Sequence, residues 1–180
     1  MQNRRVHVHD GSYFFAVVTE IRRPILTSVA AIGILRQAFR RVMAQHPFAL
    51  SAAVVLPDHL HCLLTLPDHN QDFSTRLRLI KTWFTKHCDP RLRDNVADSA
   101  RRSKGGRAVW QHRYWEHLLR DEEDYRRHVE YIHYNPVKHG YARRPIDWRY
   151  SSFQHYVAAG IYPESWGESA VDIPEGLGGE

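Results

Sequence analysis

The sequence predicts an α+β fold: a ferredoxin-like antiparallel sheet with helices on one face. Strand-length apolar runs and segments with apolar residues at helical spacing follow in the order β-α-β-β-α-β, and a further helix comes last. A length of 180 residues suits one domain with a sizeable core. Contents of 43% hydrophobic and 12% aromatic residues are typical of a folded globule.

The first half of the chain supplies a strand, a helix and a hairpin. We expect them at residues 12–21, at 27–45, and at 48–57 with 59–67. Thr27 or Ser28 is the expected N-cap of the helix, because a side-chain oxygen there can accept a backbone N–H of the first turn. The hairpin turn is indicated by Pro57-Asp58, which separates two β-prone runs.

The second half supplies another helix, a short strand and the last helix. Residues 74–88 read as a helix capped by Ser74, and 109–120 contain a short strand. The last helix is expected to begin after the N-cap Asp121, with acidic residues in its first turn, and to stop at Pro136. Between the two helices, residues 89–108 lose apolar periodicity and gather Arg, Lys and Gly, which predicts a mobile basic loop.

Charge divides the chain into a basic body and an acidic end. The net charge is +5, yet the last twenty residues hold five acids and no Lys or Arg, so the remainder carries +10. A basic body favours a polyanionic partner, most simply nucleic acid, over an ordinary basic enzyme. We assign residues 1–162 to one domain and 163–180 to a flexible acidic tail, which we hypothesise competes with DNA from within the chain.

No membrane span or secretion signal is expected. No apolar run reaches the ~18 residues that a bilayer span needs, and the apolar piece near the start is short and ends at Glu20. Cys62 and Cys88 are not spaced for a disulfide framework. These features predict a cytoplasmic protein.

The stretch HLHCLLTLP places two histidines on one side of a strand. Side chains alternate across a strand, so Leu60, Cys62 and Leu64 share an apolar face, whereas His59 and His61 share the other. We expect this second face to be open, and two adjacent imidazoles there can bind one divalent ion. His-x-His alone is a weak signal, and a solvated strand face explains it equally well.

A second His-x-His pair, His7 and His9, leaves a zinc site open as an alternative. Four histidines, these two with His59 and His61, could hold zinc, although no Cys lies at zinc-ligand spacing.

On the last helix, the rotation of about 100° per residue indicates which side of the helix carries each tyrosine. Tyr125, Val129 and Ile132 form the core stripe, and Tyr131 and Asn135 are i,i+4 neighbours on its flank, together with Asp124 and His128. Tyr134 points away from the core. From the segment alone, the favoured interpretation of Tyr131 is a half-covered surface aromatic.

LPDHLHCLLTLPD, WQHRYWEHLLRDEEDYRRHVEYIHYNPVKHGYA and DWRYSSFQHY together resemble the REP-associated tyrosine transposases, a branch of the HUH single-strand transposases of insertion sequences. The resemblance covers the chain from about residue 12 to residue 166. It implies a metal site of His59, His61 and Asn135 and a nucleophile at Tyr131. Insertion-sequence members usually carry Gln where this chain has Asn135, which leaves open whether Asn135 reaches the metal directly.

The resemblance also implies a reaction and its partners. The expected activity is metal-dependent nicking and joining of single-stranded or hairpin DNA of the REP type, with Mg²⁺ or Mn²⁺, through a 5′-phosphotyrosine link. No nucleotide cofactor is expected, since the chain shows no P-loop, and a monomer near the nucleoid is favoured. The alternative is a non-catalytic single-strand binding module of the same fold, although its strands lack an aromatic stacking signature such as the RNP motif.

Overall fold

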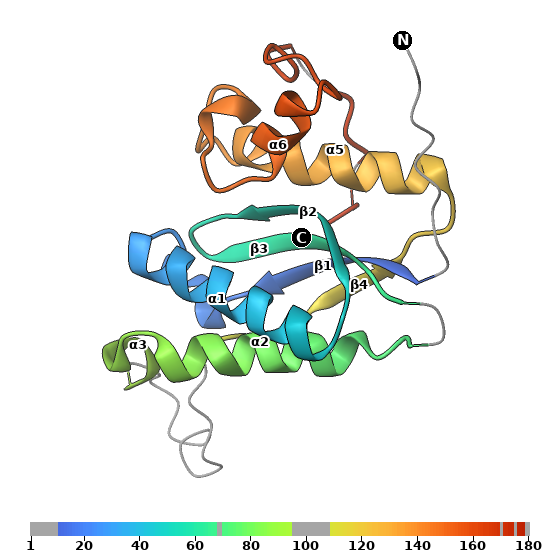
Figure 1. The fold of residues 1–180 in the computed structure, drawn as a ribbon. Helices are drawn as coiled ribbons and strands as arrows, with labels where there is room; N and C mark the ends of the chain where they lie inside the picture. Colours follow the sequence, from blue (N-terminus) through green and yellow to red (C-terminus); the bar gives the residue numbers. More distant parts are fainter. Residues whose placement is uncertain (1–10, 68–69, 95–108, 170, 175, 179–180) are drawn as a thin grey trace.

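A computed structural model describes residues 11–67, 70–94, 109–169, 171–174 and 176–178. A four-stranded antiparallel sheet in the spatial order β2-β3-β1-β4 lies between two layers of helices (Figure 1). Its strands are β1 (Ser12–Val18), β2 (Ala49–Val55), β3 (His59–Thr65) and β4 (Trp115–Leu118). The predicted α+β class, antiparallel sheet and helix-covered face are confirmed.

Helices α1 (Val29–Gln45) and α2 (Phe73–His87) cover one face of the sheet (Figure 1). Ser28 caps α1 as expected, because its Oγ accepts the Ala31 N–H at 3.1 Å. The cap predicted for α2 was wrong. Asp72, not Ser74, accepts the Thr75 N–H at 3.0 Å and also the Ser74 hydroxyl at 2.9 Å. A carboxylate two residues earlier satisfies the same first turn, so the helix begins at Phe73.

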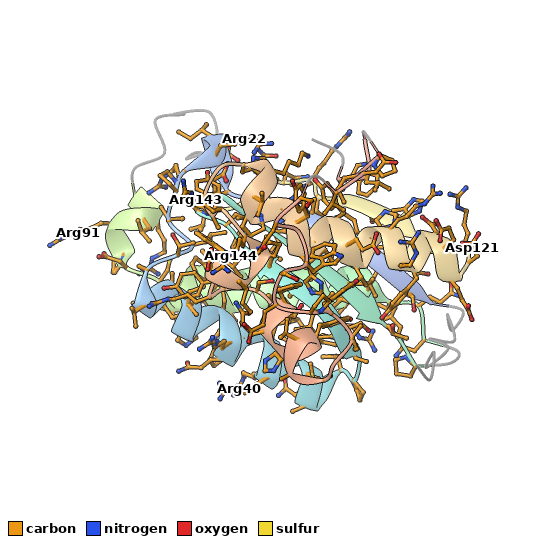
Figure 2. The ribbon with its side chains drawn as sticks, turned by 90° about the horizontal axis from the view of Figure 1, so that it is seen from above. Arg22, Arg40, Arg91, Asp121, Arg143 and Arg144 are labelled. Carbon is orange, nitrogen blue, oxygen red and sulfur yellow. The ribbon has the colours of Figure 1, made fainter. Side chains whose placement is uncertain are left out.

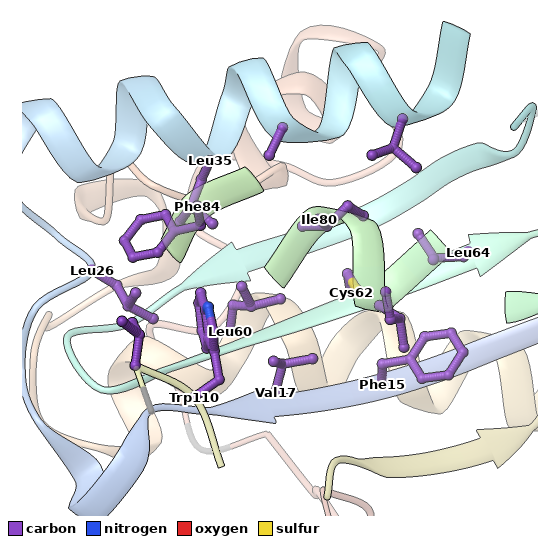
Figure 3. Packing of buried hydrophobic residues seen from close by; sticks show 14 of the residues in the cluster. Phe15, Val17, Leu26, Leu35, Leu60, Cys62, Leu64, Ile80, Phe84 and Trp110 are labelled. Carbon is purple, nitrogen blue, oxygen red and sulfur yellow. The ribbon is translucent and has the colours of Figure 1, made fainter. Parts of the chain in front are cut away.

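The main hydrophobic core fills the space between these helices and the sheet (Figure 3). The sheet contributes alternate residues, among them Phe15, Val17, Leu60, Cys62 and Leu64, and α1 and α2 contribute Leu35, Ile80 and Phe84. The predicted apolar face of the hairpin is therefore confirmed. Cys62 and Cys88 are both free and buried.

The last long helix, α5 (Glu122–Lys138), crosses the other face of the sheet with the short α6 (Phe153–Ala158) beyond it (Figure 1). Asp121 caps α5, accepting the Asp124 N–H at 2.8 Å. The predicted stop at Pro136 was wrong. Proline removes one N–H donor, but it does not prevent the residues after it from completing the last turn. That turn is closed by a hydrogen bond from the His139 N–H to the Asn135 carbonyl at 3.0 Å.

The histidine face of the sheet is thus covered by α5 and not open. Phe14, Leu63, Val129 and Ile132 form a second buried cluster there. Shorter elements complete the fold: two 3₁₀ turns, η1 (Glu20–Arg22) and η2 (Pro145–Asp147), and α3 (Pro90–Asp94).

Two predicted features fall largely outside the described residues. His7 and His9 do so entirely, as does most of the basic segment 89–108, apart from its beginning at α3. Within the described part, no helix combines the length and the apolar character that crossing a membrane requires.

Candidate active site

The hairpin turn orients the first histidine through its neighbour, Asp58. His59 Nδ1 donates to Asp58 Oδ1 at 2.6 Å, and Asp58 Oδ2 accepts from Arg22 Nη1 at 3.1 Å. The Asp58 carbonyl accepts the Thr19 N–H and hydroxyl at 2.8 and 2.9 Å, which ties the turn to the end of β1. With its proton on Nδ1, His59 presents the lone pair of Nε2, the atom that a metal would take.

The electrostatics of this turn keep Asp58 ionised. Burial alone would raise the pKa of Asp58, but the hydrogen bond and charge of His59, followed by those of Arg22, lower it below its usual range. A carboxylate that accepts the Nδ1–H raises the basicity of the other ring nitrogen. Asp58 is therefore a positioning residue for His59, and the sequence analysis did not single it out in that role.

His61 lies two residues along β3, opposite Ala16 of β1 and Val54 of β2. Its ring centroid is 4.9 Å from that of His59 and 5.2 Å from that of Tyr131, while Phe14 stacks on it at 5.3 Å. Both histidines are at least 98% buried. The predicted pairing of the two imidazoles on one face is thus present in the structure, in a buried position.

Tyr131 reaches this pair from the flank of α5. It is 2% exposed, and its phenolic oxygen accepts a hydrogen bond from Lys138 Nζ at 3.3 Å. The Lys138 ammonium also lies 4.9 Å from the centre of the Tyr131 ring. Seven residues are nearly two helical turns, so Lys138 returns to the side of α5 that carries Tyr131. The sequence analysis missed Lys138, although its i+7 spacing was the signal.

Asn135 follows Tyr131 by one helical turn, and its carboxamide is buried. Neither Oδ1 nor Nδ2 has a hydrogen-bond partner among the described residues. A buried amide without partners is costly, so this group is suited to an external ligand. Two imidazoles and one amide oxygen fit a divalent cation that accepts both nitrogen and oxygen, and Mn²⁺ does so more readily than Mg²⁺.

Tyr134, by contrast, does not face the histidines. Its ring packs edge-on against Trp166 at 6.3 Å and lies next to Gly167. The rotational assignment of the two tyrosines on α5 agrees with these contacts.

The acidic tail returns to the same site. Ile173 and Leu177 pack against the cluster that contains Tyr131, and Gly178 is buried against the Tyr131 phenol. A methyl group added to Gly178 would overlap the phenolic oxygen. Charge alone suggested a tail that interacts with the body; the structure shows apolar contacts of the tail with this cluster and Gly178 against the candidate nucleophile.

A second group of potential metal ligands was not predicted as a set: His117 of β4 with Asp124 and His128 of α5, whose ligand atoms lie within 4.8 Å of one another. The alternation of β4 and the i,i+4 spacing of Asp124 and His128 were the available signals. The two imidazole rings are stacked 4.7 Å apart at 17°, so the lone pairs of their nitrogens lie in nearly parallel planes.

Hydrogen bonds already occupy one oxygen of the carboxylate in that group, Oδ2 of Asp124. Asp124 Oδ2 accepts from His117 Nε2 at 2.9 Å and from Arg120 Nε at 3.0 Å. Burial opposes ionisation, but these hydrogen bonds lower the pKa of Asp124 to about 2. A cation bound to Oδ2 would compete with His117 and Arg120 for that oxygen. We interpret the group as an ion-pair network that fixes β4 to the start of α5.

Comparison with known proteins agrees with the fold and identifies the family of the chain. Residues 7–135 match the family described as "Transposase IS200 like". The chain is 40% identical over 173 residues to the REP-associated tyrosine transposase of Escherichia coli K12, a match that covers 96% of this chain and 94% of that protein. It is also 40% identical over 165 residues to a Haemophilus influenzae protein assigned provisionally to the same group, covering 91% and 92% of the two chains.

A solved structure resembles the whole chain. It is described as the REP-associated tyrosine transposase bound to a REP hairpin; it is 37% identical, has a TM-score of 0.72 and covers 97% of each chain. These likenesses extend over nearly all of the sequence and include the strand and helix that carry the candidate residues. The chain belongs to the IS200-like transposases and, within them, to the REP-associated tyrosine transposases.

Proposed function

We propose that this protein nicks and joins single-stranded DNA next to REP-type hairpins, with Tyr131 as nucleophile and His59, His61 and Asn135 as metal ligands. The observation that carries the proposal is the packing of the Tyr131 ring 5.2 Å from His61, whose ring is in turn 4.9 Å from His59. Three groups with complementary chemistry are therefore gathered at one buried point between β3 and α5.

The reaction requires one bond to form and one to break. The Tyr131 oxygen attacks phosphorus, the bond from phosphorus to the 3′ oxygen breaks, and the strand leaves with a free 3′-OH after that oxygen takes up a proton. The 5′ phosphate remains on Tyr131. Attack by a 3′-OH then reverses the step, restores the phenol and joins two strands.

A divalent metal, when bound by His59, His61 and Asn135, supplies Lewis-acid polarisation of the phosphate. The protein contributes the remaining chemistry. Asp58 holds the tautomer of His59, and Lys138 places a positive charge beside the oxygen that becomes the phosphoester. That charge stabilises the negative charge that gathers around the phosphate in the transition state.

Charge and surface shape support DNA as the partner. The basic body attracts a polyanion, and a largely apolar groove of about 410 Å³ between α1 and the segment after α5 includes Arg36, Arg40, Arg149 and Tyr150 in its lining. The relative of known structure is described as bound to a REP hairpin. We therefore infer a hairpin substrate for this chain. We also propose that the chain acts as a monomer and that it works in the cytoplasm near the nucleoid.

The deciding experiment compares two tyrosines on one helix. Tyr131→Phe should abolish the covalent protein–DNA adduct seen on denaturing gels with hairpin DNA and Mn²⁺, because the phenolic oxygen itself becomes the phosphoester. Tyr134→Phe is the matched control and should keep the adduct. Peptide mapping of the DNA-linked fragment should identify Tyr131.

Three results would contradict the proposal. An adduct that survives in Tyr131→Phe, or one that maps to Tyr134, would place the nucleophile elsewhere. Tight hairpin binding without any adduct from the wild-type protein would favour the non-catalytic binding module.

A further inference from the structure

The backbone after β1 adopts an unfavourable conformation at two consecutive residues. Ile21 has φ 50° and ψ 30°, and Arg22 has φ 52°, both in the left-handed region. They are the two described residues other than glycine with positive φ. For a β-branched side chain this region is sterically costly, and such strain persists only where surrounding contacts impose it.

Hydrogen bonds on both sides impose this bend. Glu20 N–H donates to the Val109 carbonyl at 2.9 Å, and Arg22 N–H donates to the Thr19 carbonyl at 3.1 Å. The Thr19 hydroxyl shares its one proton between the Arg23 carbonyl at 2.8 Å and the Asp58 carbonyl at 2.9 Å. The bend is therefore built into the fold.

Neither side chain contributes to a core. Ile21 is 76% exposed, so burial does not explain an isoleucine where glycine or asparagine would fit the backbone with less strain. The Arg22 side chain is 50% exposed and uses one nitrogen on Asp58. A guanidinium has five N–H donors, so Arg22 can hold a phosphate while it keeps Asp58.

The bend lies beside the candidate active site. Arg22 contacts Asp58, and Asp58 contacts His59, so two hydrogen bonds connect the bend to the first metal ligand. In the view from above, Arg22 and Arg143 lie well away from Asp121, the cap of α5, which is at one end of the molecule (Figure 2).

We propose that Ile21 and Arg22 form a contact for the single-stranded DNA next to the scissile phosphate. Arg22 holds a backbone phosphate, and Ile21 gives an apolar surface to the neighbouring sugar or base. The proposal rests on the proposed function only in taking DNA as the molecule that the histidine site handles. Charge favours this occupant, because an exposed Arg beside an apolar side chain matches the alternating phosphate and base of a single strand.

The test measures binding, not cleavage, so that it does not depend on the nucleophile. Fluorescence anisotropy in EDTA would use Tyr131→Phe protein and a labelled REP-type DNA hairpin, with and without a single-stranded extension. Ile21→Gly and Arg22→Gln should each weaken binding of the extended hairpin at least about threefold and leave the bare hairpin unchanged. Arg22→Gln should also reduce the slope of log Kd against log salt by about 0.7, the value for one phosphate on a single strand.

Leu118→Asn is the control, because Leu118 is also an exposed apolar residue, at 50%, but lies at the other end of the sheet. In the register, β1 pairs its first residues with Leu118 and its last with His59. This variant should bind both DNAs as the parent does. Glycine suits positive φ, so Ile21→Gly should retain the parent Tm, which excludes unfolding as the cause of its weaker binding.

Equal losses for the two DNAs, or no loss with the extended hairpin, would overturn the inference. A missing adduct in the wild-type protein would refute the proposed chemistry while leaving this binding result intact. The two proposals would therefore be refuted by different measurements.

Discussion

The two faces of the sheet bury different kinds of side chain. Between the sheet and helices α1 and α2, the core cluster is apolar, from Phe15 and Leu64 to Phe84. On the face that α5 covers, the same strands bury His59 and His61, and the helix adds Asn135 beside apolar residues. Successive side chains along β3 therefore point into these two different environments.

This difference predicts that one face of the sheet mainly stabilises the fold and that the other mainly provides chemistry. Apolar burial stabilises the fold at a rate of about 25 cal/mol per Å² and needs no partner. A buried imidazole or amide costs free energy unless it binds something, so a face that buries several is suited to a ligand. Substitutions on β3 should therefore affect activity or stability according to the face that they reach.

The largest effect is expected on the histidine face. His61→Ala should reduce cleavage of hairpin DNA to background while DNA binding stays within about twofold, because binding depends on the distributed basic charge. EDTA should do the same to the wild-type protein. His7→Ala and His9→Ala should remain active, and their inactivity would revive the four-histidine zinc site. Full activity of His61→Ala would refute the metal site.

The opposite face should respond in the opposite way. Leu64→Ala, three residues along the same strand, should lower the free energy of unfolding by about 2–5 kcal/mol, the range for a large-to-small change in a packed core. At low temperature its rate of adduct formation should match that of the wild type. Urea titration and single-turnover cleavage measure the two quantities. A stable but inactive Leu64→Ala protein would contradict the division between the faces.

The ion pairs at the start of α5 should show a pH dependence. The pKa of Asp124 in the folded protein is about 2, below its usual 3.8, so its stabilising effect is present above about pH 4 and is lost as pH falls toward 2. Asp124→Asn should therefore cost on the order of 2 kcal/mol of unfolding free energy at pH 7. Urea titrations at pH 7 and pH 2.5 test this, and an equal cost at both would exclude the ionised carboxylate as the cause.

The smallest effect concerns the tail over Tyr131. Gly178→Val should displace the tail, because a side chain there overlaps the phenol, and should speed adduct formation at least about threefold at low salt. Ending the chain after Ser169 should act in the same way. Truncation after Ser169 keeps Trp166, which packs on Tyr162 at 4.8 Å, whereas truncation after Tyr162 would remove that contact. An unchanged rate in both variants would show that the tail does not restrict the phenol.

The sequence was sufficient for the periodic parts of this molecule. Alternation along β3 separated Leu60 and Cys62 from the two histidines, and helical rotation placed Tyr131 and Asn135 on one flank of α5. Both results follow from local geometry that depends little on the rest of the chain.

The remainder depended on contacts between distant segments. The left-handed bend at Ile21 is imposed by a carbonyl of Val109, and no local pattern shows it. The cap of α2 was misplaced because Asp72 and Ser74 are both good capping residues two positions apart. Pro136 was treated as a stop, although the backbone could complete one more turn around it.

The position of Gly178 also bears on how the protein is produced for study. An affinity tag fused after Glu180 would begin three residues beyond the glycine that lies against Tyr131. Such a fusion adds bulk within a few residues of a glycine that has no room for a methyl group beside the phenol. Rates from C-terminally and N-terminally tagged preparations should differ for that reason alone, and the tag would act as an unrecognised mutation of the tail.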